Sequence, residues 1–362
     1  MAAGFFSLMQ DKVQTGESDN LGPLTGFLDL RGQKTKVLII SDLHMGRGKR
    51  DDLAYNGSLL TAMLERYYFP GGWFLVLNGD VEDLYRHSFG AIQKNWPELY
   101  RVFDLFANEN RLYKTLGNHD EELLFIKDYP YPLYQVLKIE SSAVPVFVYH
   151  GHQASQAYTK FSAIPRVLVR YLLTPFGIKN ISAARNPYRR FSIEKKAYAF
   201  SRENSCISII GHTHRALFES LSRFEIVRFE IERLCRDYMV SEGDKKKEIA
   251  QEVSELRTEL GRLRRSERRD ILRQSLYGDE LPLPCLFNSG AVISRHGINA
   301  LELDNEHIAL VYWFKEGRES KFIRRGNYKI EKLEGTPYSM TVLNRDRLDY
   351  IKARIELLGP AG

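Results

Sequence analysis

The stretch that decides the fold is VLIISDLH, residues 37–44. It begins with four apolar residues, three of them β-branched, and it ends in Asp42 and His44. An apolar run of this length is typical of a strand that is buried on both faces of a sheet. Carboxylate and imidazole groups can bind a divalent metal, but a single pair at a strand end is also common in turns and helix caps. The stretch alone therefore predicts only a buried strand.

The same pattern occurs four more times along the chain. The further runs are WFLVLNGD (73–80), RLYKTLGNHD (111–120), VPVFVYHGH (144–152) and CISIIGHTH (206–214). The segments between the first three runs have the apolar spacing of helices, and strands that alternate with helices predict an α/β fold. In such a sheet the carboxyl ends of parallel strands lie at one edge. We therefore expect the polar side chains that end these five runs to meet there.

The five motifs, in the order D-x-H, G-D-x-x-D, G-N-H-D, H-G-H and G-H-x-H, resemble those of the calcineurin-like metallophosphoesterases. The resemblance covers residues 42–214. It implies a double β-sheet sandwich flanked by helices and carrying helical insertions. It also implies two divalent metal ions, which would be bound by Asp42, His44 and His214 at one site, by Asn118, His150 and His212 at the other, and by Asp80 at both.

The resemblance also implies catalytic roles for His119 and Asp120. His119 matches a histidine that lies over the leaving-group oxygen, with Asp120 behind it. Imidazole, carboxylate and amide ligands suit Mn²⁺, Fe²⁺ or Zn²⁺, among which we favour manganese. No motif contains cysteine, which argues against a structural zinc site. Two ions about 3.5–4 Å apart can share a hydroxide that attacks phosphorus, so no protein nucleophile is needed.

Composition and termini limit the class of protein. The chain has 362 residues, a net charge of +6 and three widely spaced cysteines, Cys206, Cys235 and Cys285, in apolar surroundings. These features predict buried, reduced thiols in a cytoplasmic protein. The N-terminus has no secretory pattern, and no apolar window is long enough to span a membrane.

A basic segment lies between two of the motifs. Residues 160–202 contain ten Lys or Arg and a single acidic residue, Glu194, so their net charge is +9. This charge, interleaved with apolar residues, predicts an anionic phosphorylated substrate and peripheral association with the inner face of an anionic membrane. Nucleic acid is a less favoured partner. In charge and helical pattern the segment is similar to the insert of UDP-2,3-diacylglucosamine pyrophosphohydrolases. The candidate substrate contacts are Arg47, His152, Arg185, Arg189 and Arg190, and His152 could equally lie behind the metal ligands.

A second insertion follows the last motif. Ile249, Val253, Leu256, Leu260 and Leu263 are spaced by four and three residues, as in a coiled coil. The preceding stretch, 227–240, also has a helical pattern and could fold back on this seam. The sequence therefore predicts a projecting helical hairpin that mediates homo-oligomerisation.

These patterns divide the chain into five parts. We expect an N-terminal arm (1–34), a core (35–152 with 203–220 and 280–323), a basic helical lid (153–202), a helical hairpin (221–279), and a C-terminal strand and helix (324–362). Asp83 and His87 are expected in exposed loops or caps, and FNSGAV (287–292) is expected to form a turn near the site.

The predicted function is hydrolysis of a phosphomonoester or pyrophosphate of a small or lipid-linked anionic molecule. The alternatives are a nucleic-acid or cyclic-nucleotide phosphodiesterase, a protein phosphatase, and a scaffold that has lost its metals. Because the ligands of every motif are intact, the sequence disfavours the scaffold.

Overall fold

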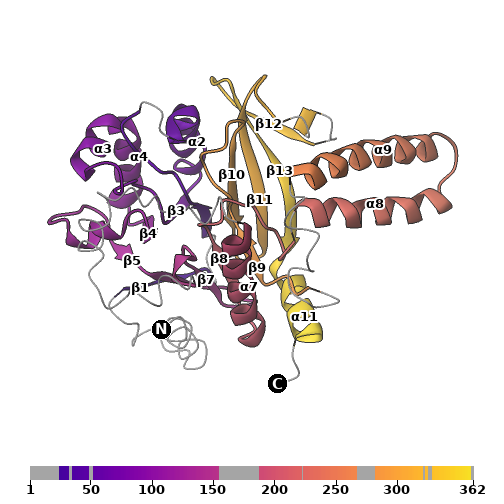
Figure 1. The fold of residues 1–362 in the computed structure, drawn as a ribbon, viewed down its shortest axis with the longest axis horizontal. Helices are drawn as coiled ribbons and strands as arrows, with labels where there is room; N and C mark the ends of the chain where they lie inside the picture. Colours follow the sequence, from indigo (N-terminus) through magenta and orange to yellow (C-terminus); the bar gives the residue numbers. More distant parts are fainter. Residues whose placement is uncertain are drawn as a thin grey trace.

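The computed structural model describes residues 24–31, 35–48, 52–154, 187–221, 223–266, 282–320, 323–324 and 328–359. These residues form two β-sheets with helices against them, so the predicted α/β fold with two sheets is confirmed (Figure 1). The five-stranded sheet has the order β1-β6-β7-β8-β9, and the eight-stranded sheet has the order β12-β13-β11-β10-β2-β3-β4-β5.

The strands of the five-stranded sheet are β1 (Thr25–Asp29), β6 (Val136–Glu140), β7 (Val146–Val148), β8 (Ile207–Ile210) and β9 (Leu286–Asn288). Those of the eight-stranded sheet are β2 (Lys36–Ile40), β3 (Trp73–Asn78), β4 (Leu112–Thr115), β5 (Leu133–Tyr134), β10 (Ile298–Leu303), β11 (His307–Lys315), β12 (Ile330–Leu333) and β13 (Tyr338–Arg347). The helices are α2 (Gly57–Met63), α3 (Phe89–Asn95), α4 (Pro97–Asn108), α7 (Pro187–Glu203), α8 (Arg223–Val240), α9 (Gly243–Ser266) and α11 (Leu348–Leu358). Shorter helical turns are η1 (Asp52–Tyr55), η2 (Leu64–Tyr68), η3 (Glu121–Phe125) and η4 (His152–Ala154).

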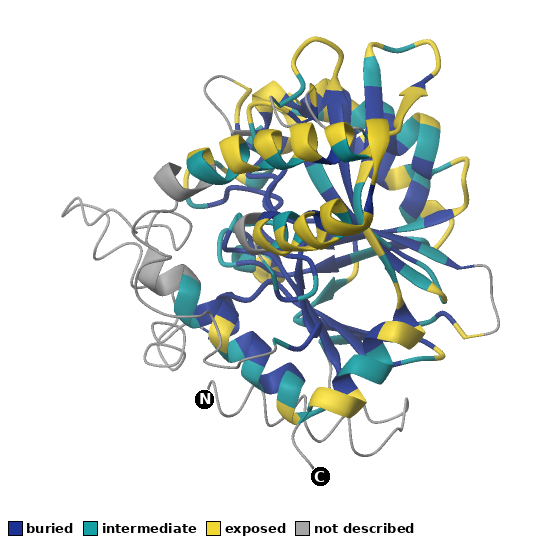
Figure 2. Cartoon of the chain, turned by 90° about the vertical axis from the view of Figure 1, so that its right-hand side faces the viewer, coloured by how far each residue is buried: buried dark blue, intermediate teal, exposed yellow. Residues whose placement is uncertain are grey.

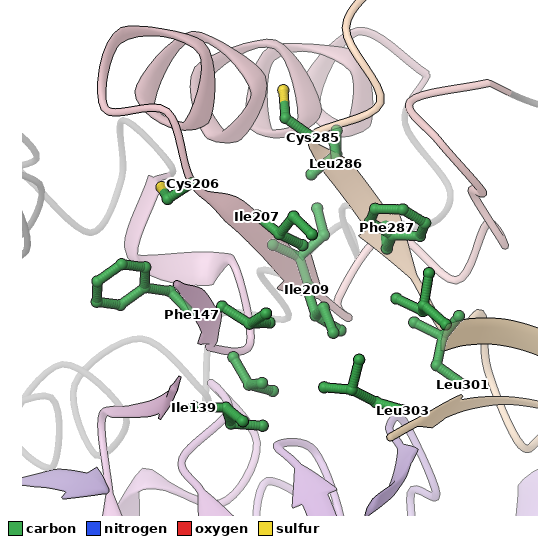
Figure 3. Packing of buried hydrophobic residues seen from close by; sticks show 14 of the residues in the cluster. Ile139, Phe147, Cys206, Ile207, Ile209, Cys285, Leu286, Phe287, Leu301 and Leu303 are labelled. Atoms are coloured by element: carbon green, nitrogen blue, oxygen red, sulfur yellow. The ribbon is translucent and has the colours of Figure 1, made fainter. Parts of the chain in front are cut away.

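Strand β2 shows why the apolar runs fold as buried strands. Val37 and Ile39 belong to a buried cluster that contains residues of both sheets, including Ile209 of β8 (Figure 3). Leu38 and Ile40 point to the other face, where they join a cluster that includes residues of α2 and α4. Since successive side chains of a strand point to opposite faces, a run that is buried on both faces must be continuously apolar.

The strand directions bring the motif loops together. Strands β2, β3 and β4 are mutually parallel, and β7 is parallel to β8. All five apolar runs of the motifs form these strands, so their polar ends are carried to the carboxyl edge of each sheet.

Two of the expected segments contain elements that the sequence pattern did not indicate. The N-terminal arm was expected to extend to residue 34, but Thr25–Asp29 pairs in parallel with β6 as an edge strand. The basic lid was expected to extend to residue 202, but α7 packs on β8 and β9 and buries Ile193, Ala197 and Tyr198. The charge of the segment hid this apolar face; among the described basic residues of α7, Lys195 is exposed and Lys196 and Arg202 are half-buried. Residues 155–186 lie outside the described residues.

Helices α8 and α9 pack against each other and extend away from the sheets (Figure 1). Seen from the side to which they extend, they show mostly exposed residues (Figure 2). Ile249 of the predicted seam is buried, and Val253, Leu256 and Leu260 are half-buried.

Cys235 of α8 is exposed, contrary to the expectation of three buried thiols, whereas Cys206 and Cys285 are buried. Among the described helices, none has both the length and the apolar character that crossing a bilayer requires.

Candidate metal centre

The structure brings the ends of the five motif strands to one place. Three groups of side chains have ligand atoms within 4.8 Å of one another, and these are Asp42 with His44 and His214, His44 with Asp80 and His119, and Asp80 with His150 and His212. Oδ2 of Asp80 is central, since it lies 3.9 Å from Nε2 of His44 and 3.2 Å from Nε2 of His150. One carboxylate therefore faces ligand atoms of both predicted metal sites.

The nitrogen atoms of these histidines face each other in pairs. Nε2 of His44 lies 3.2 Å from Nε2 of His214, and Nδ1 of His212 lies 3.2 Å from Nε2 of His150. Oδ1 of Asn118 is buried and has no hydrogen-bond partner among the described residues. Converging imidazole nitrogens together with a buried, unsatisfied amide oxygen fit a site for divalent cations.

The backbone of these loops is in an uncommon conformation. Positive φ angles of 46–63° occur at five of the seven predicted ligands, which are Asp42, His44, Asp80, His212 and His214. Left-handed backbone is rare for residues with a side chain, and it is concentrated at functional sites, where the surrounding structure maintains it. Here the His44 amide donates to the Asp80 carbonyl (2.9 Å), and the His212 amide donates to Oδ2 of Asp42 (3.1 Å).

Gly117 of the G-N-H-D motif permits a close approach between two loops. A Cβ atom at this position would lie 2.2 Å from both the amide nitrogen and Oδ1 of Asp80. Only glycine leaves room for the loop after β4 to reach the Asp80 loop.

The imidazoles hold the two carboxylates in their charged form. Burial alone would raise the pKa of Asp42, but His214 and His150 lower it to about 2. The pKa of Asp80 is likewise well below its ordinary value, because His150 and His119 outweigh the effect of burial.

The imidazoles themselves differ in charge. Burial lowers the pKa of His44 to about 4, and burial with the nearby His150 places the pKa of His212 well below its ordinary value. Both rings are therefore neutral near pH 7, as metal ligands must be. Burial would also lower the pKa of His150, but Asp80 raises it to about 10. A metal ion that binds there must displace this proton.

His119 lies beside the ligands and is held by a carboxylate. Nδ1 of His119 is 3.0 Å from Oδ1 of Asp83, and Nε2 is 4.0 Å from Oδ2 of Asp80. Its ring also packs against Tyr85, with 4.4 Å between the ring centroids. Burial would lower the pKa of His119, but the Asp80 and Asp83 carboxylates outweigh it and raise the pKa. A protonated imidazole at the edge of a metal cluster can act as a general acid.

Comparison with known proteins agrees with this site. A family model described as calcineurin-like phosphoesterase matches residues 35–216, half of the chain. The chain belongs to this family. Family membership implies a metal-dependent hydrolase of phosphoesters, and the three clusters supply candidate ligands for divalent ions. A search of curated proteins found no match.

Solved structures that are similar to this chain include the following three. YfcE, a phosphoesterase from E. coli, has 12% identity and a TM-score of 0.31, with coverage of 76% of this chain and 91% of its own. Vacuolar protein sorting 29 from Cryptosporidium parvum has 12% identity and a TM-score of 0.32, with coverage of 79% and 93%. A protein of unknown function from Aquifex aeolicus has 19% identity and a TM-score of 0.29, with coverage of 50% and 80%. Likenesses this distant carry no argument about activity.

Two aspartates of the phosphoesterase differ from expectation. Asp83 was expected to be exposed or to cap a helix, but it is fully buried and contacts His119. Asp120 was expected behind His119, but its carboxylate accepts hydrogen bonds from the backbone amides of Val81 (2.8 Å) and Gly117 (2.6 Å). Asp83 is therefore the carboxylate in direct contact with the His119 imidazole, and Asp120 also connects two loops.

The predicted substrate contacts have different environments. Arg47 is exposed on the loop after β2. His152 is buried, and its Nε2 lies 2.8 Å from Oε1 of Glu121, so it supports the cluster from the side of η3. Arg185 lies outside the described residues. Arg189 and Arg190 lie in the first turn of α7, but their side chains are also outside the described part of the chain.

Sequence reasoning missed some supports of the ligand loops. The Ser41 hydroxyl donates to Oδ2 of Asp42 (2.6 Å), and it precedes that ligand directly in the sequence. Nδ2 of Asn288 donates to the carbonyl of Gly211 (3.0 Å) and to the Thr213 hydroxyl (2.9 Å). Asn288, the last residue of β9, therefore supports the loop that carries His212 and His214, and the small polar residues of FNSGAV were the available signal.

Proposed function

We propose that this phosphoesterase uses two divalent metal ions to hydrolyse a phosphomonoester or pyrophosphate of a small or lipid-linked anionic substrate. The observation that carries the proposal is the position of Asp80. Its Oδ2 lies between histidines of two separate clusters, 3.9 Å from His44 and 3.2 Å from His150. A carboxylate in this position suits a pair of ions about 3.5–4 Å apart.

Each side chain then has a specific task. Asp42, His44 and His214 would hold one ion, Asn118, His150 and His212 would hold the other, and Asp80 would contact both. Two such ions would supply a bound hydroxide and offset the negative charge of the phosphate. His119, kept protonated by Asp80 and Asp83, would donate its proton to the leaving-group oxygen.

The basic segment supports an anionic substrate. Residues 160–202 have a net charge of +9 and lie between the motif of His150 and that of His212 and His214. Such a charge raises the local concentration of anions and anionic surfaces in a salt-dependent way. We propose that Arg185, Arg189 and Arg190 increase affinity for the substrate and leave the chemical step unchanged.

The free state of all three cysteines supports a reducing compartment such as the cytoplasm.

A substrate panel tests the proposal. The purified protein with Mn²⁺, Fe²⁺ or Zn²⁺ would be assayed on aryl phosphates, bis-aryl phosphates, cyclic nucleotides, UDP-sugars and short DNA. We expect turnover of monoesters or pyrophosphates, and we expect the His119→Ala variant to be slow on them. Faster turnover of bis-aryl phosphates, cyclic nucleotides or DNA would identify a phosphodiesterase instead. No turnover of any substrate with any metal would contradict the proposed function.

A further inference from the structure

A lysine is fully buried next to the loops of the candidate metal centre. Lys114 lies on β4, and its side chain has 0% exposure. Its ammonium group donates to the Glu82 carboxylate and to the Tyr129 hydroxyl (3.1 Å), and it lies 3.7 Å from Oδ2 of Asp120. One cation is therefore enclosed between two buried carboxylates.

Glu82 has a complete set of donors. Besides Lys114, its Oε1 accepts hydrogen bonds from the hydroxyls of Tyr100 (3.0 Å) and Tyr129 (3.1 Å). Burial and the charge of Glu82 raise the pKa of both tyrosines well above its ordinary value, so both hydroxyls remain donors. Glu82 follows Asp80 by two residues, so this network fixes the loop after β3.

Asp120 fixes the loop after β4 and reaches back to the first loop. Its two oxygens accept from the backbone amides of Gly117, which precedes Asn118, and of Val81, which follows Asp80. Lys114 is the cation that faces both Glu82 and Asp120. It thus links the loop that carries Asp80 to the loop that carries Asn118 and His119.

We propose that Lys114 is a positioning residue that sets the distance between Asp80 and the Asn118–His119 loop. This inference rests on the proposed two-metal function, because only then must the two loops bind one ion together. A buried ion pair is weak evidence for stability, since well-packed apolar residues of similar volume often stabilise a protein as much or more. Here the charges of Lys114, Glu82 and Asp120 fix the position of the Asp80 loop relative to the loop of Asn118 and His119. Replacing a residue that supports a metal ligand typically lowers metal affinity or activity by about 10–100-fold.

The test compares three variants with the wild-type protein. Lys114→Met removes the cation and leaves the buried carboxylates of Glu82 and Asp120 without a counter-charge. This loss destabilises the folded state, so the single variant alone does not decide the question. The decisive variant is Lys114→Met with Glu82→Gln, because glutamine is neutral and still accepts hydrogen bonds from Tyr100 and Tyr129. The matched control is Lys138→Met, since Lys138 is also a buried strand lysine, with its ammonium 2.5 Å from the Glu140 carboxylate, on β6 of the other sheet.

Three measurements separate positioning from stability. Titration calorimetry gives the Mn²⁺ dissociation constants, and thermal unfolding gives Tm. Steady-state kinetics give kcat and KM for aryl phosphates with good and poor leaving groups. We expect the double variant to keep its Tm within a few degrees, to bind its weaker Mn²⁺ ion about 10–100-fold less tightly, and to lose kcat mainly on the poor leaving group. Lys138→Met should match the wild type in both Mn²⁺ affinity and kcat.

The outcomes distinguish this inference from the proposed function. Wild-type Mn²⁺ affinity and wild-type rates in a folded double variant would overturn the role of Lys114. The same changes in Lys138→Met as in the double variant would also overturn it, because they would reflect general loss of a buried charge. If the wild type binds Mn²⁺ but hydrolyses no phosphoester, the proposed function fails while calorimetry still decides the role of Lys114. If the wild type binds no Mn²⁺, both fail.

Discussion

Nδ1 of His119 lies 3.0 Å from Oδ1 of Asp83, although the two residues belong to loops that follow different strands. When Nδ1 donates to this carboxylate, the ring is fixed with its other nitrogen toward Asp80, at 4.0 Å. Asp83 is itself buried and also accepts from the Arg86 side chain. Asp83 therefore orients the His119 ring relative to the central carboxylate of the cluster.

Replacing Asp83 with Asn should slow turnover by about 10-fold and leave metal content unchanged, because it removes a charge that keeps His119 protonated and oriented. A double-mutant cycle with His119→Ala checks this prediction. The double variant should be no slower than His119→Ala alone, since residues that act as one unit are not additive. Losses that simply multiply would show that Asp83 does not act through His119.

Replacing His119 with Ala should keep the metal content and slow turnover by roughly 10²–10⁴-fold, the usual contribution of a general acid. The loss should be small for aryl phosphates whose leaving groups need no proton and large for alkyl phosphates. Steady-state kinetics across a leaving-group series, with metal analysis of the same samples, measure both quantities. Equal losses across the series would leave His119 only an electrostatic role.

Replacing Asp80 with Asn should lower the metal content at both sites and reduce activity more than about 100-fold, the upper range for losing a mere supporting partner. The reason is that Oδ2 of Asp80 faces His44 and His150, which belong to different clusters. Elemental analysis after gel filtration gives the ions per chain. The exposed Asp349 offers a matched control, because Asp349→Asn changes the same group far along the chain in α11. A variant that keeps two ions and full activity would contradict a bridging role.

The sequence predicted the ligand loops well because their physics is local. An apolar, β-branched run such as residues 37–40 is typical of a buried strand, and parallel strands carry their polar ends to one edge. Asp42, His44 and the later motif residues therefore converge as expected. The helical hairpin also followed from local spacing, since Ile249 and Val253 repeat at the interval that lets two helices pack.

The rest depended on contacts between distant segments. Lys114 sits in a strand of the pattern L-Y-K-T, where a lysine predicts an exposed face, and only Glu82 and Asp120 from other loops explain its burial. Asp83 is buried for the same kind of reason. Strand β1 was missed because five residues after an unpatterned, glycine-containing stretch give no periodic signal, and its pairing with β6 is the information that was lacking.

Stability should fall as pH rises from about 4.5 to 7, through Glu302. Burial raises the pKa of Glu302 to about 7, despite a hydrogen bond from the Tyr68 hydroxyl at 2.8 Å. Because the folded state holds this proton more tightly than the unfolded state, ionisation in this window destabilises the fold by up to about 3 kcal/mol. Below about pH 4.5 the group is protonated in both states and has no such effect.

The Glu302→Gln variant tests this assignment. It cannot ionise, so its free energy of unfolding should exceed that of the wild type increasingly from pH 4.5 to 7 and by a constant amount above that. Urea unfolding at several pH values measures the difference. A difference that does not vary with pH would show that Glu302 has an ordinary pKa in the folded protein.

The hairpin of α8 and α9 should mediate self-association without taking part in the reaction. Among the described elements the two helices pack mainly against each other, and Val253, Leu256 and Leu260 remain half-buried. A short helical pair of this kind is marginal by itself in water, so its seam requires another surface, which we expect to be a second copy.

Deleting residues 222–278 and joining the ends with a short Gly-Ser linker tests this role. The described residues that flank the deleted stretch lie close together, since the Ser220 amide donates to the Leu286 carbonyl at 2.7 Å. Light scattering should give a lower mass per particle, in units of the chain, while metal content and turnover stay unchanged. A milder variant, with Val253, Leu256 and Leu260 replaced by Asn, should lower the mass in the same way with the backbone intact. If the mass is unchanged and activity collapses in both variants, the hairpin belongs to the active site and not to an interface between copies.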